Sequence, residues 1–207
     1  MKTLTKSAVD SNPIKQFAKW YKVILKSGIK EPTAMSIATA TEKGVPSVRT
    51  VLLKGFDESG FLFFTNYKSR KGKELTENPV AELLFYWRDL QRQVRISGKV
   101  EKVTKQESED YFNSRPLKSR IGAWASKQSE VIPDRKYLEK QFKEFTKKYS
   151  ERSRFAGKKN VPLPSYWGGF RLIPERFEFW QGRENRLHDR ICYIKKNNKW
   201  KIVRLAP

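Results

Sequence analysis

The sequence is poor in the residues that build metal sites and disulfides. Its 207 residues include one cysteine, Cys192, and one histidine, His188. A lone cysteine cannot form an internal disulfide, and one residue of each kind leaves too few soft ligands for a zinc site. We therefore expect no metal and a chain suited to a reducing compartment.

Long hydrophobic runs and common active-site motifs are also missing. No stretch approaches the roughly 18 apolar residues of a membrane span, and the first residues, MKTLTKSAVDSNPIKQ, lack an apolar leader segment. We expect a soluble, cytoplasmic protein with no membrane partner. The motifs G-x-G-x-x-G, G-x-x-x-x-G-K-[ST], H-E-x-x-H and G-x-S-x-G are absent too. A nucleotide cofactor would therefore be held in another way.

Acidic residues are scarce relative to basic ones. Twenty-two Asp and Glu face 44 Lys and Arg, which gives a formal charge of +22, and aromatic residues make up 13% of the chain. Such a field attracts phosphates, nucleic acid and anionic membranes alike. One hypothesis is therefore a basic β-barrel that binds nucleic acid. Nucleic acid is the less favoured partner, because basic residues also cluster at phosphate-sized motifs.

The first half of the chain predicts one helix followed by short strands. Asn12 is a favoured helix cap, Pro13 suits the first helical position, and apolar residues recur at helical spacing over about 13–27, until Gly28. From Thr33 to about Val103 turn residues separate short apolar runs, which predicts an antiparallel sheet or barrel. The five runs are AMSIATA, SVRTVLLKGF, GFLFFTNY, VAELLFYW and QVRISGKVEKV.

Three further helices are predicted. The segment from Ser69 to Asn78 begins with a capping serine and stops before a proline. Thr104 and Glu107 form a capping box at the start of the next one, and an apolar stripe follows Pro133.

The end of the chain predicts strands after a loop. The basic stretch from Ser150 to Asn160 has the composition of an exposed, mobile loop. The runs GGFRLIPERFEFW, RICYI and WKIVRL predict three more strands. The fold class is therefore mainly β with flanking helices (α+β), and no linker divides the single domain of residues 1–207.

The segment Asn66-Tyr67-Lys68-Ser69-Arg70-Lys71-Gly72-Lys73 is a candidate phosphate site. It follows a strand and opens a helix, so that a hydroxyl, two kinds of cation and free backbone N–H groups converge. Cations at a helix N-terminus oppose the macrodipole unless an anion lies between them. The alternative is a capped helix whose basic first turn is solvated.

Other polar segments carry weaker signals. In Arg49–Lys54 the alternation of a strand sends Arg49, Val51 and Leu53 to one side and the intervening residues to the other. Each face carries one cation. A cation at the end of an apolar row is also typical of a rim residue that snorkels to the solvent. The segments Arg92–Arg95 and Trp124–Ser129, the latter in a loop between helices, could donate neutral hydrogen bonds to a ligand, or could simply be polar surface.

Taken together, these motifs resemble one known family. The runs are RTVLLK, NYKSRKGKEL, RQVRISG, YFNSRP, SRIGAWASKQS, PSYWGGFRLIPERFEFWQG, RLHDR and RLAP. Their order and spacing are similar to those of the pyridoxamine 5'-phosphate oxidase family from about Pro13 to Pro207. The combination is specific, although no single run is.

The resemblance implies a fold and a reaction. The fold would be an antiparallel FMN-binding split β-barrel, and a homodimer would hold FMN at the subunit interface. Residues of about 165–207 would serve dimerisation and substrate binding. The enzyme would oxidise pyridoxamine or pyridoxine 5'-phosphate with O2 to pyridoxal 5'-phosphate and H2O2, with ammonia from the amine, in vitamin B6 biosynthesis and salvage.

The resemblance also implies site residues, transferred position by position. The cofactor contacts would be Arg49, Thr50, Val51, Leu52, Leu53, Lys54, Phe64, Thr65, Arg70, Lys71, Gln93, Gln128, Ser129, Trp180 and Arg190. The substrate contacts would be Lys54, Tyr111, Arg115, Ser119, Arg186 and His188, the last two being the catalytic candidates.

Three positions depart from the family pattern. Phe64 stands where relatives often have tyrosine, so a hydroxyl contact is lost, although the ring can still pack. Arg183 and Asn185 stand where relatives commonly carry glycine and histidine, which changes the loop beside the substrate residues.

The lone histidine lies in the cationic segment Arg186-Leu187-His188-Asp189-Arg190. Two phosphorylated ligands would bring about four negative charges to these cations. We expect Arg186 to promote the reaction and a neutral His188 to accept a hydrogen bond from the substrate, with Asp189 softening the effect of the arginines. The alternatives are a solvated turn before a strand, or a split-barrel flavoprotein with another substrate.

Overall fold

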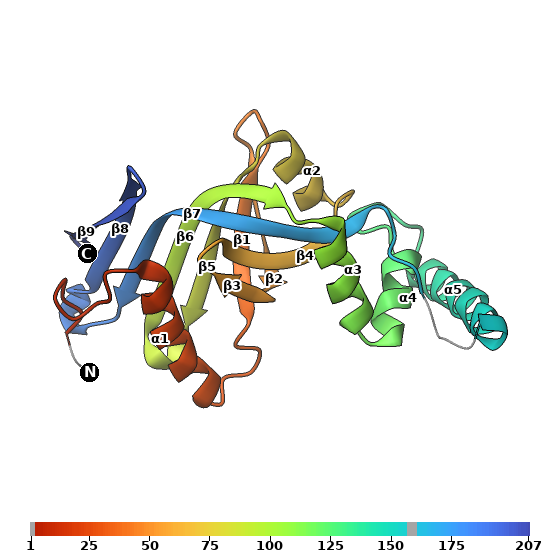
Figure 1. Ribbon diagram of the computed structural model, residues 1–207, viewed down its shortest axis with the longest axis horizontal. Helices are drawn as coiled ribbons and strands as arrows, with labels where there is room; N and C mark the ends of the chain where they lie inside the picture. The colour runs from red at the N-terminus through yellow and green to blue at the C-terminus, as the bar shows by residue number, and fades with distance from the viewer. Residues whose placement is uncertain (1–2, 157–160) are drawn as a thin grey trace. The chain divides into compact units, whose positions relative to one another are not determined.

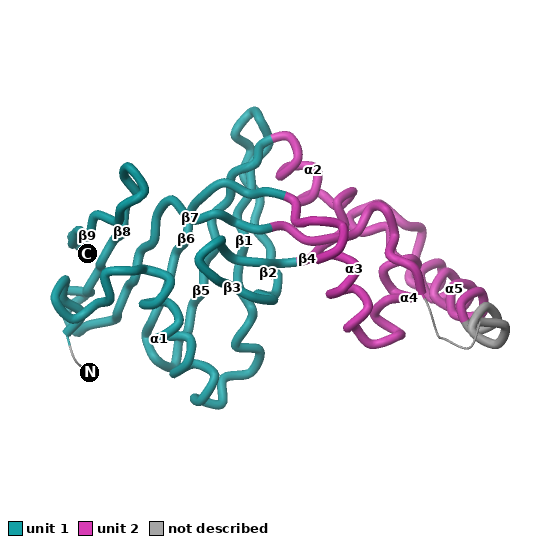
Figure 2. Tube along the Cα trace, viewed as in Figure 1, with its two compact units in different colours: residues 1–63, 78–101, 171–207 teal, residues 64–77, 102–170 magenta. Residues whose placement is uncertain are grey.

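The computed structural model describes residues 3–156 and 161–207. Within these residues the chain forms two compact units, coloured separately in Figure 2. Unit 1 holds the described residues up to Phe63 together with Asn78–Glu101 and Arg171–Pro207, and unit 2 holds those of Phe64–Glu77 and Lys102–Phe170. The chain passes between the units along the strands β4, β6 and β7, and also between Glu77 and Asn78, after the helix α2.

The strands form an antiparallel sheet whose order is β2-β1-β5-β6-β7-β4-β3, with β8 pairing to β7 and β9 to β8 (Figure 1). This arrangement confirms the predicted mainly β class with flanking helices. The strands are β1 (Ala34–Ala40), β2 (Pro46–Leu52), β3 (Gly55–Asp57), β4 (Gly60–Asn66), β5 (Val80–Trp87), β6 (Arg92–Lys102), β7 (Trp167–Gln181), β8 (Asp189–Lys196) and β9 (Lys199–Leu205).

One predicted strand is divided. The run SVRTVLLKGF forms β2 and β3, with a break at Leu53 and Lys54. The backbone N–H of Leu53 donates to Thr33 O at 2.8 Å and that of Lys54 to Leu62 O at 2.8 Å. The two neighbouring amides thus bond to different segments, which ends the pairing of β2 with β1. A continuous apolar run does not reveal such a change of partner.

Helix α1 (Pro13–Lys26) covers one face of the sheet in unit 1 (Figure 1). The Asn12 side chain caps it, accepting from the N–H of Ile14 at 2.8 Å, as predicted. Phe17 is fully buried, and its ring centroid lies 4.9 Å from that of Phe56 and 5.0 Å from those of Phe61 and Phe85. This aromatic cluster is the centre of the core of unit 1.

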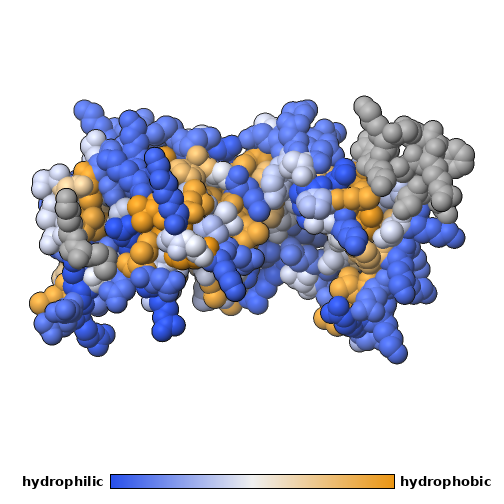
Figure 3. Space-filling view, turned by 90° about the horizontal axis from the view of Figure 1, so that it is seen from below, coloured by the Kyte–Doolittle hydropathy of each residue, from blue (hydrophilic) through white to orange (hydrophobic). Residues whose placement is uncertain are grey.

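The opposite face of the same sheet is partly exposed. On β2, Val48 and Leu52 are exposed, at 69% and 37%, and on β5 Tyr86 is exposed at 58%. Figure 3 shows apolar areas between hydrophilic side chains on one surface of the molecule. Exposed apolar area on a sheet face is a feature of protein interfaces.

The last two strands form a tight hairpin. Lys196 on β8 pairs with Lys199 on β9, and the two residues between them, Asn197 and Asn198, have φ of 47° and 59°. Asparagine tolerates this left-handed conformation, which a two-residue hairpin turn requires. The predicted pair of strands is confirmed.

Unit 2 contains the remaining α-helices, and α3, α4 and α5 contribute to its core of Phe112, Ile121, Tyr149, Val161 and Trp167. The helices are α2 (Arg70–Glu77), α3 (Lys105–Ser114), α4 (Leu117–Ala125) and α5 (Arg135–Ala156).

Two features of these helices correct the sequence-based description. Helix α4 was not predicted, and it includes Trp124 and Ala125, which were expected in a loop. Helix α5 continues to Ala156, although a loop was expected from Ser150; residues 157–160 lie outside the described part. The capping box of α3, Thr104 with Glu107, is present as predicted. Among the helices described, none is long and apolar enough to cross a membrane.

Candidate functional site

The strand β2 presents its predicted cofactor residues on two sides. Thr50 and Leu52 are exposed, whereas Arg49 and Val51 are half-buried and Leu53 is buried, as the alternation predicted. The Arg49 guanidinium crosses to the neighbouring strand and donates to the Thr39 hydroxyl, and its second Nη donates to Ser47 Oγ. Arg49 is therefore held in place by hydroxyl groups.

Lys54 follows at the break after β2. Its side chain is exposed, and its backbone is fixed by the bond to Leu62 O at 2.8 Å. It thus lies at the end of the residue run that the resemblance assigns to the cofactor.

Three predicted cofactor residues of unit 2 meet around a buried ammonium group. Lys71 is 7% exposed, and its Nζ lies 3.1 Å from Thr65 Oγ1 and 3.3 Å from Gln128 Oε1. Thr65 Oγ1 also donates to Gln128 Oε1 at 3.1 Å. Residues from β4, from α2 and from the loop after α4 therefore converge, although they are up to 63 positions apart in sequence. The neighbouring Ser129 is exposed and has φ of 70°.

The turn before α2 uses its serine internally. The buried Ser69 hydroxyl donates to Asn66 O at 2.6 Å and accepts from the N–H of Gly72 at 3.3 Å. A Cβ at Gly72 would lie 2.3 Å from Tyr67 O, so the turn requires glycine. The hydroxyl of Ser69 thus supports the capped-helix alternative.

Arg70 and Lys71, although adjacent in sequence, have different partners. The Arg70 Nε donates to Glu74 Oε1 at 2.9 Å, and the Arg70 side chain is 60% exposed. Lys71, by contrast, is buried beside Thr65 and Gln128. The predicted convergence of serine, arginine and lysine is therefore only partly present.

The predicted substrate residues of unit 2 lie where α3 ends and α4 begins. Tyr111 stacks on Phe64, with ring centroids 4.0 Å apart and an interplanar angle of 20°, and Phe64 stacks on Trp167 at 5.6 Å. The Phe64 ring therefore packs as expected without its hydroxyl. Ser119 lies in the first turn of α4 and is half-buried.

Arg115 is the cation of this aromatic group. Its guanidinium carbon lies 4.7 Å from the Trp167 ring centroid, and its buried Nη1 has no hydrogen-bond partner among the described residues. Burial lowers the pKa of Arg115, and the interaction with Tyr111 opposes this only in part. A buried donor without an acceptor is unfavourable unless a ligand supplies one. An anionic ligand suits this position.

In unit 1, Trp180 lies on β7, Arg190 lies on β8 and His188 directly precedes β8. Trp180 pairs with Arg190 across the two strands, and the Trp180 and His188 ring centroids are 4.7 Å apart. Gln93, on β6, is half-buried. Arg186 lies in the short helix η2 (Glu184–Arg186), where its side chain is exposed and its φ is 61°.

The hydrogen bond of His188 changes its expected role. Its Nδ1 accepts from the backbone N–H of Arg183 at 3.1 Å. A neutral imidazole that accepts at Nδ1 carries its proton on Nε2. The expectation that His188 accepts a hydrogen bond from a substrate is therefore wrong for this tautomer, because Nε2 is a donor.

Asp189 acts on other groups than expected. Its carboxylate accepts from Arg183 Nε at 2.8 Å, from Arg204 Nη1 at 2.9 Å and from the Leu4 N–H at 3.1 Å. Burial by itself raises the pKa of Asp189, but these hydrogen bonds outweigh it, and the net pKa is lowered. Asp189 therefore fixes the Arg183 side chain and connects the backbone of Leu4 with the side chain of Arg204 on β9.

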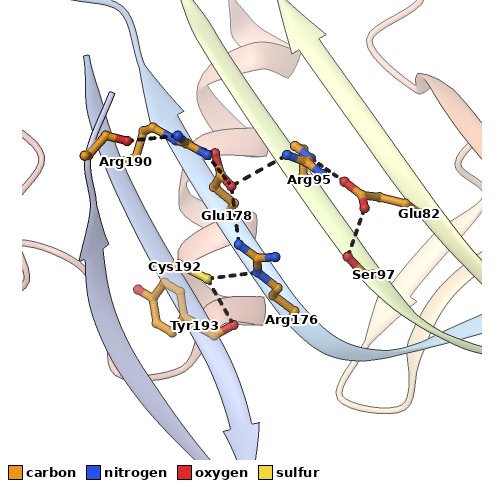
Figure 4. Close-up of polar contacts among 9 residues, drawn as sticks. Glu82, Arg95, Ser97, Arg176, Glu178, Arg190, Cys192 and Tyr193 are labelled. Carbon is orange, nitrogen blue, oxygen red and sulfur yellow. Dashed lines mark hydrogen bonds and ion pairs between the residues drawn. The ribbon is translucent and has the colours of Figure 1, made fainter. Parts of the chain in front are cut away.

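One charged cluster was missed. Glu178 on β7 is 3% exposed and lies among three arginines, Arg95, Arg176 and Arg190 (Figure 4). The available signal was the alternation of Arg176-Phe177-Glu178-Phe179, which places Arg176 and Glu178 on one face of the strand and the two buried rings on the other.

Comparison with known proteins adds independent findings. Residues 24–149 match the family described as pyridoxamine 5'-phosphate oxidase, and residues 167–207 match a pyridoxine 5'-phosphate oxidase C-terminal dimerisation region. The chain is 53% identical to a pyridoxine/pyridoxamine 5'-phosphate oxidase of Trichormus variabilis, over 100% of this chain and 94% of that protein. It is 52% identical to one of Burkholderia thailandensis, over 99% and 94%.

Solved structures share the fold. PhzG from Burkholderia lata, in complex with tetrahydrophenazine-1-carboxylic acid, is 32% identical with a TM-score of 0.90, covering 100% of this chain and 99% of that one. A pyridoxamine 5'-phosphate oxidase-related, FMN binding protein from Nostoc punctiforme has a TM-score of 0.72 at 16% identity, covering 96% and 100%. The expected split-barrel fold is thus confirmed.

Proposed function

Because the chain belongs to the pyridoxamine 5'-phosphate oxidase family, we propose that it oxidises pyridoxamine and pyridoxine 5'-phosphates with FMN and O2. The products are pyridoxal 5'-phosphate and H2O2, with ammonia from the amine. The observation that carries this proposal is the 53% identity, over the whole chain, to a relative of that name. The reaction would serve vitamin B6 biosynthesis and salvage.

The residues of unit 2 fit an anionic cofactor. FMN, when bound, supplies the redox chemistry by accepting two electrons that O2 later removes. Lys71, with Thr65 and Gln128, would bind it, because a buried ammonium group is favoured by an anion. Arg49 in unit 1, which two hydroxyl groups hold in place, is also proposed as a cofactor residue.

The substrate phosphate would bind at Arg115. Its unpaired Nη1 is a donor in need of an acceptor, and Tyr111 and Ser119 add neutral donors on the same pair of helices. Arg186 would stabilise charge on the substrate, and the Nε2 proton of His188 would orient it.

A homodimer is the proposed assembly, with FMN at its interface. The C-terminal dimerisation region and the exposed Val48, Leu52 and Tyr86 of the uncovered sheet face support it.

Flavin binding and substrate oxidation test the proposal directly. Purified protein titrated with FMN should become yellow, and anaerobic addition of pyridoxine 5'-phosphate should bleach the flavin absorbance. Arg186→Leu should keep FMN while losing most of the turnover. A colourless protein that does not bind FMN but retains RNA would favour the alternative of a basic nucleic-acid-binding protein.

A second candidate is a flavoprotein with another substrate. It is favoured by the 0.90 TM-score to PhzG, whose structure holds a tricyclic carboxylic acid. The two candidates differ in the group that Arg115 would bind, phosphate or carboxylate. Bleaching by pyridoxine 5'-phosphate but not by a reduced phenazine carboxylic acid selects the first.

A further inference from the structure

Glu178 binds Arg190 with both carboxylate oxygens (Figure 4). Arg190 Nε donates to Oε1 at 2.9 Å and Nη2 to Oε2 at 3.1 Å, while Nη1 donates to Ala206 O at 2.9 Å. Such a two-point pair fixes the plane of a guanidinium as well as its position.

The other two arginines of the cluster approach Glu178 less closely. Arg95 Nη1 and Arg176 Nη2 lie 3.8 Å and 3.7 Å from Oε2. Each has a nearer partner, because Arg95 Nε donates to Glu82 and Arg176 Nε lies 3.1 Å from Cys192 Sγ. Glu178 therefore orients Arg190 in particular.

The position of the cluster connects it with the proposed cofactor residues. Along β7, Glu178 and Trp180 are two residues apart and share a face of the sheet, and Arg190 is the cross-strand partner of Trp180. Along β6, Gln93 and Arg95 share a face in the same way. The three proposed cofactor residues of these strands, Gln93, Trp180 and Arg190, are thus on the face that contains Glu178.

The donor count of Arg190 leaves room for a ligand. A guanidinium has five N–H donors, and three are engaged by Glu178 and Ala206. Within the described residues two donors therefore remain, one on each Nη, on a side chain that is 26% exposed.

We propose that Glu178 is a positioning residue for FMN: it holds Arg190 so that the two remaining donors face the cofactor. This inference rests on the proposed function, because Arg190 is assigned to FMN there. Replacing the Glu178 carboxylate with an amide would leave one acceptor oxygen at this position in place of two, so that the two-point pair that fixes the plane of the guanidinium would be lost.

A comparison of two carboxylates tests this. The full chain, stripped of FMN, is titrated with FMN as wild type, Glu178→Gln and Glu82→Gln. Both variants remove one negative charge from the same cluster, but only Glu178 binds Arg190. We expect Glu178→Gln to weaken FMN binding about tenfold, the effect of one hydrogen bond to a charged group, and Glu82→Gln to change it less than about twofold. A general field effect would instead tighten the binding of the anionic FMN in both variants, because each loses a negative charge. Tightening by both variants, or equal weakening by both through a general disturbance of the cluster, would overturn the inference.

A double-mutant cycle separates positioning from a structural role. If Glu178 acts through Arg190, Glu178→Gln should have no further effect on FMN affinity in an Arg190→Ala background. Additive losses would overturn the inference. Thermal unfolding without FMN checks that each variant folds. If Glu178→Gln does not fold, Glu178→Asp keeps the charge with a shorter reach and should weaken binding in the same Arg190-dependent way.

The single variants distinguish the two levels of failure. If Arg190→Ala weakens FMN binding and Glu178→Gln does not, the inference about Glu178 is wrong and the proposed function stands. If Arg190→Ala leaves the FMN affinity unchanged, Arg190 is not a cofactor residue. If the wild type does not bind FMN, the proposed function itself fails.

Discussion

Arg190 in unit 1 and Arg115 in unit 2 are both assigned to ligands, yet their surroundings differ. Arg190 is bound at two points by the buried carboxylate of Glu178. Arg115 lies over the ring of Trp167 and keeps a buried Nη1 without a hydrogen-bond partner in the described chain.

The difference indicates two ways in which a protein can hold an arginine side chain for an anionic ligand. A carboxylate fixes Arg190 in orientation but neutralises part of its charge. An aromatic ring supports Arg115 without supplying an acceptor, so that a ligand gains the full hydrogen bond. We therefore expect Arg115 to determine affinity for a substrate phosphate, and Arg190 to contribute mainly geometry.

The largest effect is expected from a variant of the hydrophobic core, which serves as a reference for the variants of the ligand-binding residues. Phe17→Ala removes a fully buried ring between α1 and the sheet, and should lower the free energy of unfolding by about 3–5 kcal/mol. Chemical denaturation measures it. Val23→Ala, at an exposed position of the same helix, should change it by less than about 0.5 kcal/mol. Equal losses would contradict the assignment of the core.

Arg115→Leu should come next in size. Loss of the charged donor should raise KM for pyridoxine 5'-phosphate about 10- to 100-fold, with FMN affinity unchanged. Steady-state kinetics and an FMN titration measure the two quantities. Lys118→Ala, an exposed cation on α4, is the matched control and should leave KM within about twofold. A normal KM in the Arg115 variant would remove the contrast with Arg190.

A smaller effect is expected at Asp189, which pairs with arginines as Glu178 does. Because its folded-state pKa is lowered, Asp189 stabilises the fold at a pH above its unfolded pKa of about 4. This contribution is lost as the pH falls through the folded-state pKa. Stability against denaturant, measured from neutral to acidic pH, should therefore differ most between wild type and Asp189→Asn at neutral pH. A constant difference across the range would show that the charge of Asp189 contributes nothing.

The smallest change is spectroscopic. His188 is the one histidine of the chain, so its ring ¹⁵N signals in NMR need no assignment by mutation. Since Nδ1 accepts from Arg183 N–H, the neutral ring should show a protonated Nε2 and an unprotonated Nδ1. The reverse pattern would restore His188 as a hydrogen-bond acceptor toward the substrate.

Local patterns predicted much of the fold. The Asn12 cap, the Thr104–Glu107 capping box and most strands were found because their signals lie within a few adjacent residues. Helix α4 was missed because it is nine residues long, contains Gly122 and buries only Ile121 and Ala125. Its stability comes from packing in the core of unit 2 rather than from its own periodicity.

The candidate site was predicted by residue type but not by partner. Ser69, Arg70 and Lys71 are adjacent in the sequence after β4, and a shared phosphate site was predicted from that adjacency. Folding instead paired Arg70 with Glu74, used Ser69 within the turn, and brought Gln128 to Lys71 from 57 residues away. Contacts of that separation depend on the packing of helices, which spacing does not encode.

The amino-acid order by itself determined most of the strands, the helix caps, the family and the residues proposed to bind phosphorylated ligands, because each depends on neighbouring residues or on a matching series of motifs. Only the tertiary structure decided which cations meet a carboxylate and which do not. Glu178 is an acid in a strand until β6, β7 and β8 lie side by side, and only then do three arginines surround it. The electrostatic interactions of a site follow distances in space, and folding sets those distances.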